Sequence, residues 1–541
     1  MLLKLEKISK YAGERCLFRI DRLTLAEGEK IGVIGQNGAG KSTLLGIMAG
    51  KVQPEEGYVS RYCKFSSITQ LDSLEDIRQM VNPVVGRQFA TRRNYTDFMS
   101  GGERTRYKIA AALSEESSLL FADEPSANLD IKGTALLQSK LQQFAGALVV
   151  VSHDRELLDA VCTGIWELED GEVKVYRGNY TSYCRQKETE QKRREREYEN
   201  YIQEKNQLEV AIVDRKSRSA STRKTPKRMG NSEARLHKMG DQKAKANLNK
   251  AVKSLESRLD KLAIKEKPKE SLAVAFDFAN TGGLYSKVVV RGEKISKKFG
   301  NRVIFEAAEF SLLKGQKVAL LGDNGCGKTT LLNMIDKREA SIYVSAKARI
   351  GYFRQGMDDL ELNKSVLDNI MATTIYEEGI IRNLLAQLLF RREDVFKQAC
   401  ILSGGERTRV GLAKIIASEA NVLFLDEPTN YLDLPSVEAL ETVLSAYQGT
   451  MLFVSHDRQF IDKVATHLMI IESGKLSLLQ GNYSQYINHQ NDAKNNKTQE
   501  EQIILDYRLS EVLSRLSVAK EKEKVAQLER EYHELLARTR Q

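Results

Sequence analysis

Phosphate-binding residues occur twice in the chain with the same spacing. GQNGAGKS, Gly35–Ser42, returns as GDNGCGKT, Gly322–Thr329. Each follows an apolar strand-like run and precedes an apolar helix-like run, which is the context of a P-loop. In such a loop the glycines let backbone N–H groups surround phosphate oxygens, and the lysine adds a positive charge near the β- and γ-phosphates. The pattern therefore predicts two nucleoside triphosphate sites, at Lys41 and at Lys328.

The expected phosphate-contacting residues follow from these two loops. They are Gly35, Asn37, Gly38, Gly40, Lys41, Ser42 and Thr43 in the first loop, and Gly322, Asn324, Gly325, Gly327, Lys328, Thr329 and Thr330 in the second. The hydroxyls of Ser42 and Thr329 are suited to ligate Mg²⁺. One such motif arises by chance in a glycine-rich turn, but two in the same strand–loop–helix context argue strongly against that reading.

Two apolar runs, LLFADE and VLFLDE, end in paired carboxylates. Asp123 and Asp426 are placed to hold Mg²⁺, directly or through water. Glu124 and Glu427 follow one residue later and are candidates to orient or deprotonate the attacking water. An acidic cap at a strand end is the structural alternative, which the repetition of the pair disfavours. These residues predict hydrolysis of ATP to ADP and phosphate.

Further segments repeat as well, so the chain contains a duplicated domain. MSGGERTR returns as LSGGERTR, and VVVSHDR as LFVSHDR, each 303 positions later, whereas the P-loop lysines lie 287 positions apart (41 and 328). The second copy therefore has 16 extra residues between its lysine and its SGGE motif. We expect an α/β fold with one P-loop ATPase domain at residues 1–180 and another at 286–490.

A polar, basic segment lies between the two copies. Residues 181–270 contain 25 Lys and Arg against 14 Asp and Glu, whereas the whole chain has a net charge of +10. Two polar helical runs, 184–214 (without Gly or Pro) and about 232–265, predict an antiparallel helical hairpin about 45 Å long at 1.5 Å per residue. The hairpin would occupy residues 181–285 with its tip at about 215–231, and residues 491–541 predict a C-terminal helical extension.

A basic excess confined to one segment predicts a polyanionic partner, although a solvated helical surface is the alternative. No Phe, Tyr or Trp occurs from residue 202 to residue 275, so aromatic stacking on bases is not expected there. We therefore expect salt-dependent phosphate contacts with RNA. The candidate side chains are Lys216, Arg218, Arg223, Lys224, Lys227 and Arg228.

The same composition excludes other classes of protein. No apolar run of about 18 residues occurs, so no membrane-spanning helix is expected. The six cysteines are scattered without a C-x-x-C pair, which argues against a zinc site or a disulfide framework and is typical of a reducing cytoplasm. We expect a cytoplasmic monomer in which the two copies pair with each other.

The order S-G-G-E, then D-E-P about 20 residues later, then S-H-D resembles the ATP-binding-cassette ATPases. By that resemblance, each signature loop contacts the γ-phosphate bound by the opposite copy, so Lys41 works with Ser403 and Lys328 with Ser100. The resemblance also implies Q-loop residues that contact the nucleotide and its metal, switch histidines, and aromatic residues that stack on adenine. The implied residues are Ser100, Gly101, Gly102, Ser403, Gly404 and Gly405 (signature), Gln70 and Gln355 (Q-loop), His153 and His456 (switch), and Tyr11 and Phe299 (adenine).

Tandem cassettes, a basic hairpin between them and no membrane span together resemble the ABC-F family. The resemblance implies binding at the E site of the 70S ribosome, with the hairpin directed past 23S rRNA toward the P-site tRNA and the peptidyl-transferase centre. Only 59 positions separate Lys41 from Ser100, too few for the arm insertion of some housekeeping members. This favours the antibiotic-resistance subgroup, with most similarity to PoxtA-type proteins and phenicol or oxazolidinone resistance. A housekeeping translation factor and the ATPase subunit of a transporter are the alternatives.

One motif departs from the family pattern D-E-P-T-N-H-L-D. The first copy reads DEPSANLD, in which Ala127 offers no side-chain hydrogen bond, and the second reads DEPTNYLD. We therefore expect the two copies to hydrolyse ATP at different rates.

Overall fold

The computed structural model describes residues 1–69, 81–89, 101–221, 231–262, 265, 286–300, 302–354, 360–391 and 393–488. The chain divides into two compact units. One unit contains both cassettes (residues 1–161, 166–174 and 274 onward), and the other contains the helical hairpin (162–165 and 175–273). The expected tip residues 222–230 and the expected C-terminal extension lie outside the described residues.

The first cassette is built on a sheet with the strand order β4-β1-β2-β9-β8-β3-β7-β6-β5. Strands β5, β6, β7 and β3 are parallel, and runs such as LLFAD and ALVVV are buried over nearly their whole length, as parallel strands covered on both faces should be. The strands are β1 Leu3–Ala12, β2 Arg15–Leu25, β3 Lys30–Gly35, β4 Glu56–Arg61, β5 Phe65–Ile68, β6 Leu119–Asp123, β7 Ala147–Val151, β8 Gly164–Glu169 and β9 Glu172–Arg177. The helices are α1 Lys41–Ala49, α2 Pro83–Gln88, α3 Gly101–Ser114, α4 Ile131–Gln143 and α5 Arg155–Val161.

The second cassette repeats this plan. Its strands form one sheet in the order β14-β15-β16-β12-β17-β18 and another in the order β11-β10-β13. The strands are β10 Val288–Phe299, β11 Arg302–Leu313, β12 Lys317–Leu321, β13 Ile342–Val344, β14 Ile350–Phe353, β15 Val422–Asp426, β16 Thr450–Val454, β17 His467–Glu472 and β18 Lys475–Gln480. The helices are α8 Lys328–Asp336, α9 Val366–Met371, α10 Glu378–Gln387, α11 Gly404–Ile416, α12 Leu434–Ala446 and α13 Arg458–Val464, with 3₁₀ turns η1 Asp394–Phe396 and η2 Ala399–Ile401.

The parallel strands explain where chemistry can occur. The ends of β3, β6 and β7 lie at one edge of the sheet because these strands run in the same direction and in register. This edge brings together the P-loop after β3, the acidic pair at the end of β6 and His153 just after β7. Strands β12, β15 and β16 do the same in the second copy.

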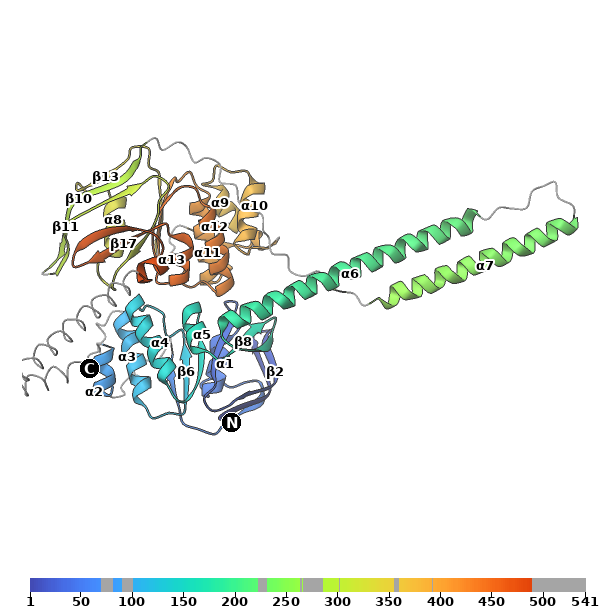
Figure 1. Cartoon of the computed structure of the whole chain (residues 1–541), viewed down its shortest axis with the longest axis horizontal. Coiled ribbons are helices and arrows are strands. Elements are labelled where there is room, and N and C mark those ends of the chain that lie inside the picture. The colour runs from blue at the N-terminus through green and yellow to red at the C-terminus, as the bar shows by residue number, and fades with distance from the viewer. Residues whose placement is uncertain are drawn as a thin grey trace, which may run out of the picture. The chain divides into compact units, whose positions relative to one another are not determined.

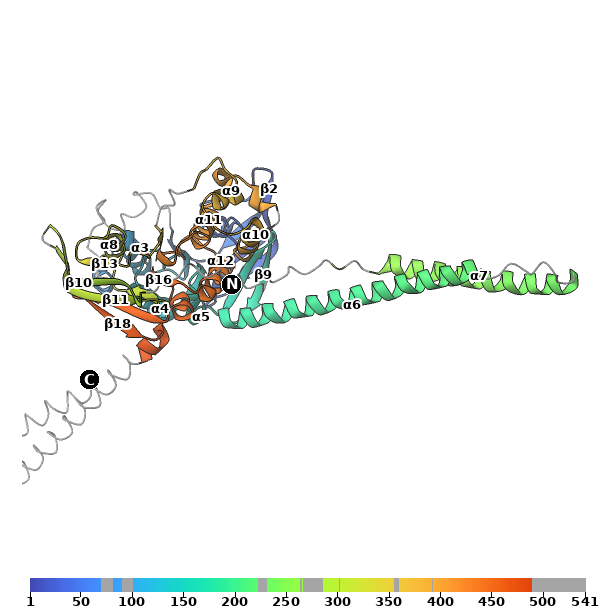
Figure 2. The same ribbon diagram turned by 90° about the horizontal axis from the view of Figure 1, so that it is seen from above.

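The hairpin consists of α6 Tyr180–Ser221 and α7 Asn231–Lys261, which run side by side in both views (Figures 1 and 2). Leu208 and Ile212 of α6 and Val252 of α7 are buried. Helix α6 is longer than its sequence indicated: its 42 residues span about 63 Å at 1.5 Å per residue. Lys216 and Arg218 therefore lie on the helix and not in the turn at the tip. No described helix is both long and apolar enough to cross a membrane.

Candidate nucleotide sites

Each P-loop is a tight turn that closes around its own lysine. Gly40 and Gly327 cap α1 and α8 with φ of 102° and 112°, in the left-handed region that favours glycine. A Cβ at Gly327 would lie 2.4 Å from the Ile304 side chain, so no larger residue fits without movement. Lys41 Nζ donates to the carbonyls of Gly35 and Gln36 at 2.8 and 3.1 Å. Lys328 makes the equivalent contacts in the second loop.

Burial changes the electrostatics around the first lysine. Lys41 and Lys328 are only 8% and 9% exposed. Burial lowers the pKa of Lys41, and the nearby Glu124, Asp433 and Asp123 oppose that shift. A buried ammonium group aimed along the loop needs an anionic partner, which the phosphates of a nucleotide supply. We call the nucleotide site at Lys41 site 1 and the one at Lys328 site 2.

The residues expected to hold Mg²⁺ meet in both copies. Burial raises the pKa of Asp123, and a hydrogen bond from Ser42 opposes the shift; Asp426 and Thr329 show the same pattern. Asp123 Oδ1 is buried and has no hydrogen-bond partner among the described residues. Mg²⁺ usually takes one or two carboxylate or hydroxyl oxygens together with phosphate oxygens. The donor set therefore fits this ion.

The second carboxylate of each pair lies beside a histidine. Glu124 Oε1 is 3.4 Å from His153 Nε2, and Glu427 Oε1 is 3.1 Å from His456 Nε2. Burial raises the pKa of both glutamates to about 8, although the P-loop lysine opposes it. Burial lowers the pKa of both histidines to about 4, so the imidazoles are neutral near pH 7. A carboxyl group with a pKa of about 8 is poised near the working pH, and its ionised form, beside a neutral imidazole, can orient and deprotonate a water molecule.

The backbone at these glutamates is unusual. Glu124 and Glu427 have φ of 47° and 52°, values rarely adopted by residues with a side chain. The Glu124 N–H donates to the Val151 carbonyl at 2.9 Å, and the Glu427 N–H donates to Val454 at 3.0 Å. These bonds fix each glutamate against the adjacent parallel strand. Strain of this kind is common where a side chain must be held for chemistry.

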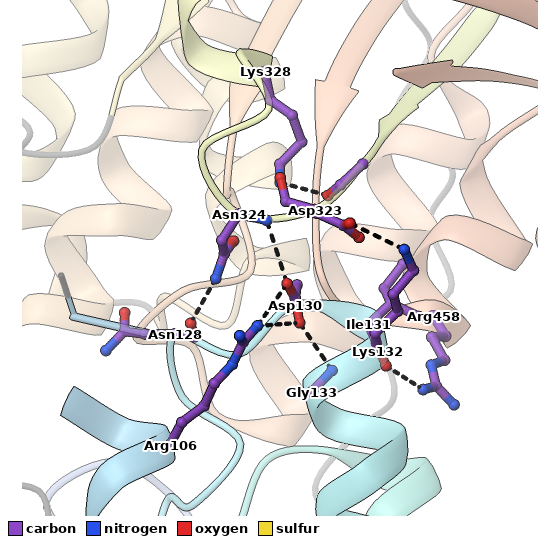
Figure 3. A network of polar contacts seen from close by, with 11 residues as sticks. Arg106, Asn128, Asp130, Ile131, Lys132, Gly133, Asp323, Asn324, Lys328 and Arg458 are labelled. Carbon is purple, nitrogen blue, oxygen red and sulfur yellow. Dashed lines mark hydrogen bonds and ion pairs between the residues drawn. The ribbon is translucent and has the colours of Figure 1, made fainter. Parts of the chain in front are cut away.

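Each P-loop also contacts the opposite cassette. Asn37 donates from its backbone N–H to Asp433 Oδ2 at 2.9 Å and from Nδ2 to the Tyr431 carbonyl at 2.7 Å. The mirror contacts run from Asn324 to Asp130 Oδ2 at 3.3 Å and to the Asn128 carbonyl at 3.0 Å (Figure 3). Both sites are therefore composed of residues from the two copies.

The signature glycines lie at the same two contacts. A Cβ at Gly405 would lie 2.8 Å from Asn37 Nδ2, and a Cβ at Gly102 would lie 3.0 Å from Asn324 Nδ2. Ser403 caps α11 in a capping box with Glu406. A cavity of about 1740 Å³ is lined by residues of both P-loops, both glutamates and both histidines, together with Gly101, Gly102, Ser403, Gly404 and Gly405. Ser100, Gln70 and Gln355 lie outside the described residues.

The two candidate adenine residues differ in position. Phe299 lines the cavity and is 57% exposed. Tyr11 is not among the lining residues; its hydroxyl accepts a hydrogen bond from Arg19 at 2.8 Å, and its N–H donates to Glu55. At the P-loop spacing of 287 positions, Phe299 corresponds to Ala12 and not to Tyr11. The stacking role of Tyr11 stays a prediction.

Several residues at the sites were not anticipated from the motifs. Leu17, Arg302 and Ile304 line the cavity near the P-loops. Asp130 and Asp433 cap α4 and α12 and accept the cross-cassette hydrogen bonds. The repetition of the LD dipeptide after both DEP motifs was the signal that could have revealed these two aspartates.

The basic residues of the hairpin are described only in part. Lys216 Nζ lies 2.7 Å from Glu256 Oε1 on α7, and Arg218 pairs with Asp214 on its own helix at 3.0 Å. Both side chains are more than half exposed. Arg223, Lys224, Lys227 and Arg228 lie outside the described residues.

Comparison with known proteins decides the family. A sequence model of the ABC transporter family matches residues 18–85 and 305–430, and an extension model described by the same family name matches 166–278. The chain is 32% identical over its full length to the ribosome protection protein VmlR of Bacillus subtilis, covering 98% of that protein. The chain belongs to the ABC-F family. Its ABC ATPase domains bind ATP and hydrolyse it to ADP and phosphate.

Two further comparisons find similar proteins. Over 82% of the chain and 92% of the relative, the sequence is 33% identical to the erythromycin resistance ATP-binding protein MsrA of Staphylococcus epidermidis. The archaeal ribosome recycling factor aABCE1, solved with the ribosomal stalk protein aP1, has a TM-score of 0.60 at 20% identity, covering 88% of this chain and 90% of its own. At this level of identity the likeness concerns the fold alone.

Proposed function

We propose that this ABC-F protein binds the 70S ribosome in its ATP-bound state and confers antibiotic resistance by ribosome protection. The observation that carries the proposal is the 32% identity to the ribosome protection protein VmlR along essentially the whole of both chains. The likeness to the erythromycin resistance protein MsrA supports the same conclusion. The proposal places the chain in the cytoplasm, where ribosomes work.

The hairpin supplies the contact with RNA in this proposal. Lys216 and Arg218 each form an exposed ion pair, and such pairs contribute little to stability. A phosphate oxygen can therefore replace the carboxylate at small cost, and the binding should weaken with salt. From the E site the hairpin would extend past 23S rRNA toward the P-site tRNA and the peptidyl-transferase centre. Residues 181–285 would form this linker between cassettes at 1–180 and 286–490.

The nucleotide sites supply the switch. Lys41 and Lys328 would bind the phosphates, and Asn37 and Asn324 already contact the opposite cassette, so bound ATP favours the closed pair. Mg²⁺, held by Asp123 with Ser42 and by Asp426 with Thr329, would neutralise charge on the phosphates. Glu124 and Glu427 would orient the attacking water and accept its proton, and His153 and His456 would hold these carboxylates in place. Hydrolysis then favours opening and release.

The class of antibiotic is the most specific part of the proposal. By the resemblance to PoxtA-type proteins we propose phenicols and oxazolidinones as the drugs that are displaced. The linker would dislodge the drug directly or by moving the P-site tRNA.

The test is co-sedimentation of the Glu124→Gln/Glu427→Gln variant with 70S ribosomes in ATP, over a series of salt concentrations. The variant should pellet with ribosomes in ATP and not in ADP, and pelleting should fade as salt rises. The matched control combines these substitutions with Lys216→Glu and Arg218→Glu, which should reduce pelleting without changing ATP binding. Absence of pelleting at low salt would contradict the proposal.

Measurements of antibiotic susceptibility then distinguish a resistance protein from a housekeeping translation factor. Expression in a sensitive bacterium should raise the inhibitory concentration of a phenicol and an oxazolidinone, and the double glutamine variant should not. Ribosome binding without any change in susceptibility would favour a housekeeping translation factor. Recovery of a membrane permease in place of ribosomes would favour the transporter alternative.

A further inference from the structure

One guanidinium group links the signature helix of the first cassette to the P-loop of the second. Arg106 lies on α3, and its Nη2 donates to both oxygens of Asp130, at 2.9 Å to Oδ1 and 2.8 Å to Oδ2. Asp130 Oδ1 also accepts from the Gly133 N–H at 2.8 Å and so caps α4. Asp130 Oδ2 accepts from the Asn324 N–H at 3.3 Å (Figure 3). The side chain of Asp130 is 6% exposed, so this network is largely shielded from water.

The same hydrogen-bond network reaches the P-loop that carries the phosphate-binding lysine of site 2. Asn324 lies four residues before Lys328 in the P-loop of site 2. Its side-chain amide donates to the Asn128 carbonyl, and the Cα of Gly102 is so close that a Cβ there would lie 2.9 Å from the same carbonyl. The signature helix, the loop after DEP and the opposite P-loop are therefore connected through Asp130 and Asn128.

The equivalent residue of the second cassette is engaged elsewhere. Arg409 occupies the position of Arg106, 303 residues later. Its Nη1 donates to the Leu388 carbonyl at 2.9 Å, and its guanidinium lies 4.9 Å from the centre of the Phe390 ring. Leu388 and Phe390 belong to the stretch in which the second copy carries its 16 extra residues. Asp433, the counterpart of Asp130, makes the same capping contact with the N–H of Ser436 at 3.1 Å, and it also accepts a hydrogen bond from the Ser436 hydroxyl, whereas Asp130 accepts from Arg106.

We propose that Arg106 is a positioning residue for ATP hydrolysis at site 2, and that Arg409, whose charge lies near Asp433 but whose described hydrogen bond goes to the Leu388 carbonyl, does not play this part at site 1. Arg106 holds the Asp130 carboxylate so that one oxygen faces the Asn324 N–H across the interface. This fixes the P-loop of site 2 against the signature loop of the other cassette when the two are closed. The inference rests on the ATPase activity alone and needs no ribosome, so its failure is separate from failure of ribosome protection.

Loss of Arg106 should affect ATP hydrolysis at site 2 differently from ATP binding there. Binding of ATP to the P-loop of an open cassette does not use Arg106, whereas hydrolysis needs the closed pair. Loss of Arg106 should therefore lower kcat at site 2 and leave ATP affinity within about twofold. A hydrogen bond between charged groups is strong enough that the loss should be about tenfold or more.

The test measures each site separately in the full-length protein. The Glu124→Gln background leaves site 2 as the active site, and the Glu427→Gln background leaves site 1. Arg106→Gln and Arg106→Lys are measured in both backgrounds for kcat, KM and affinity for a non-hydrolysable ATP analogue. Arg409→Gln in both backgrounds is the matched control from the other copy. Asp130→Asn, which keeps an oxygen for capping α4, is the second route to the same contact.

The expected result is a site-specific loss. Arg106→Gln and Asp130→Asn should each lower kcat at site 2 at least about fivefold more than at site 1, and Arg106→Lys should recover most of the activity because it restores the charge. A smaller difference between the sites in both variants would overturn the proposal. So would a loss of analogue affinity that accounts for the whole effect, or a mirror-image loss at site 1 caused by Arg409→Gln.

Discussion

Arg155 and Glu441 form a buried ion pair between the two cassettes. Arg155 Nη2 lies 2.7 Å from Glu441 Oε1, Nη1 lies 3.2 Å from Oε2, and the two side chains are 2% and 4% exposed. Lys463 also contacts Glu441 Oε2 at 2.8 Å. The position equivalent to Glu441 in the first copy is Gln138, so the repeat has no mirror image of this pair. The two copies are therefore joined asymmetrically.

This asymmetry gives the first prediction. Glu441→Gln removes the carboxylate to which the buried Arg155 donates its hydrogen bonds, while the charges of Asp457 and Glu438 stay near it, and breaking a buried pair of this kind costs about 3–5 kcal/mol. The matched control is Glu156→Gln, which breaks the more exposed pair between Glu156 and Arg458 and should cost about 1 kcal/mol or less. Thermal unfolding of the two variants should show a clearly lower midpoint for Glu441→Gln. Equal midpoints would mean that the interface does not depend on the buried pair.

The second prediction concerns the unequal loops after the glutamates. Thr429 Oγ1 lies 3.0 Å from Ser455 Oγ, whereas the equivalent Ser126 and Ser152 oxygens lie 3.5 Å apart. The looser contact should hold Glu124 less firmly than Glu427. We therefore expect Glu427→Gln to remove more of the total ATP turnover than Glu124→Gln, by about threefold or more, on the scale of one weakened hydrogen bond. Phosphate release by the two single variants measures this, and equal residual rates would contradict it.

The third prediction follows from the raised glutamate pKa values. A carboxyl with a pKa of about 8 in the folded protein, against an ordinary value of 4.5, binds more protons when folded, so its contribution to stability falls as pH rises from about 4.5 to 8. The histidines, whose pKa is lowered to about 4, act in the opposite direction only up to about pH 6.5. Between pH 6.5 and 8 only the glutamate effect remains of these two.

The nucleotide-free protein should therefore lose stability between pH 6.5 and 8, by up to about 2 kcal/mol for each glutamate. Glu124→Gln/Glu427→Gln should show a smaller pH dependence in this window, because glutamine does not titrate. Thermal midpoints at pH 6.5 and 8 provide the measurement, and the difference between wild type and variant cancels the other titrating groups. Parallel pH curves for the two proteins would show that the glutamates titrate normally.

The fourth prediction compares the two aromatic candidates. Phe299→Ala should weaken ATP binding at site 2 by about 1 kcal/mol or more, since a stacked ring contributes on that scale. Tyr11→Ala should change binding at site 1 less than twofold if its ring stays with Arg19 and Glu55. Titration of each variant with a fluorescent adenine nucleotide distinguishes the sites. Equal losses would instead support adenine stacking by both residues.

The sequence predicted the α/β fold and the two P-loops because these depend on local patterns: apolar runs, glycines and their spacing. The pairing of each P-loop with the opposite copy was implied by the family resemblance, but the individual hydrogen bonds across the cassettes depend on which elements meet in space. Arg106 and Arg409 occupy identical GGERTR motifs, yet one binds Asp130 and the other the Leu388 carbonyl. Likewise, the register in which α6 packs against α7, with a hydrogen bond between Ser219 and Asn249 at 2.8 Å, is not indicated by either helical pattern alone.

The capping aspartates have a consequence for repeated cycles of the ATPase. Asp130 and Asp433 each use one oxygen for the first turn of their own helix and the other oxygen for the opposite P-loop. When the cassettes separate, the second oxygen exchanges its P-loop partner for water, although Asp130 keeps Arg106, and the first oxygen keeps its partner in its own helix. Helices α4 and α12 therefore stay intact at the moment of opening. The two cassettes can therefore separate and re-associate many times without either cassette having to refold.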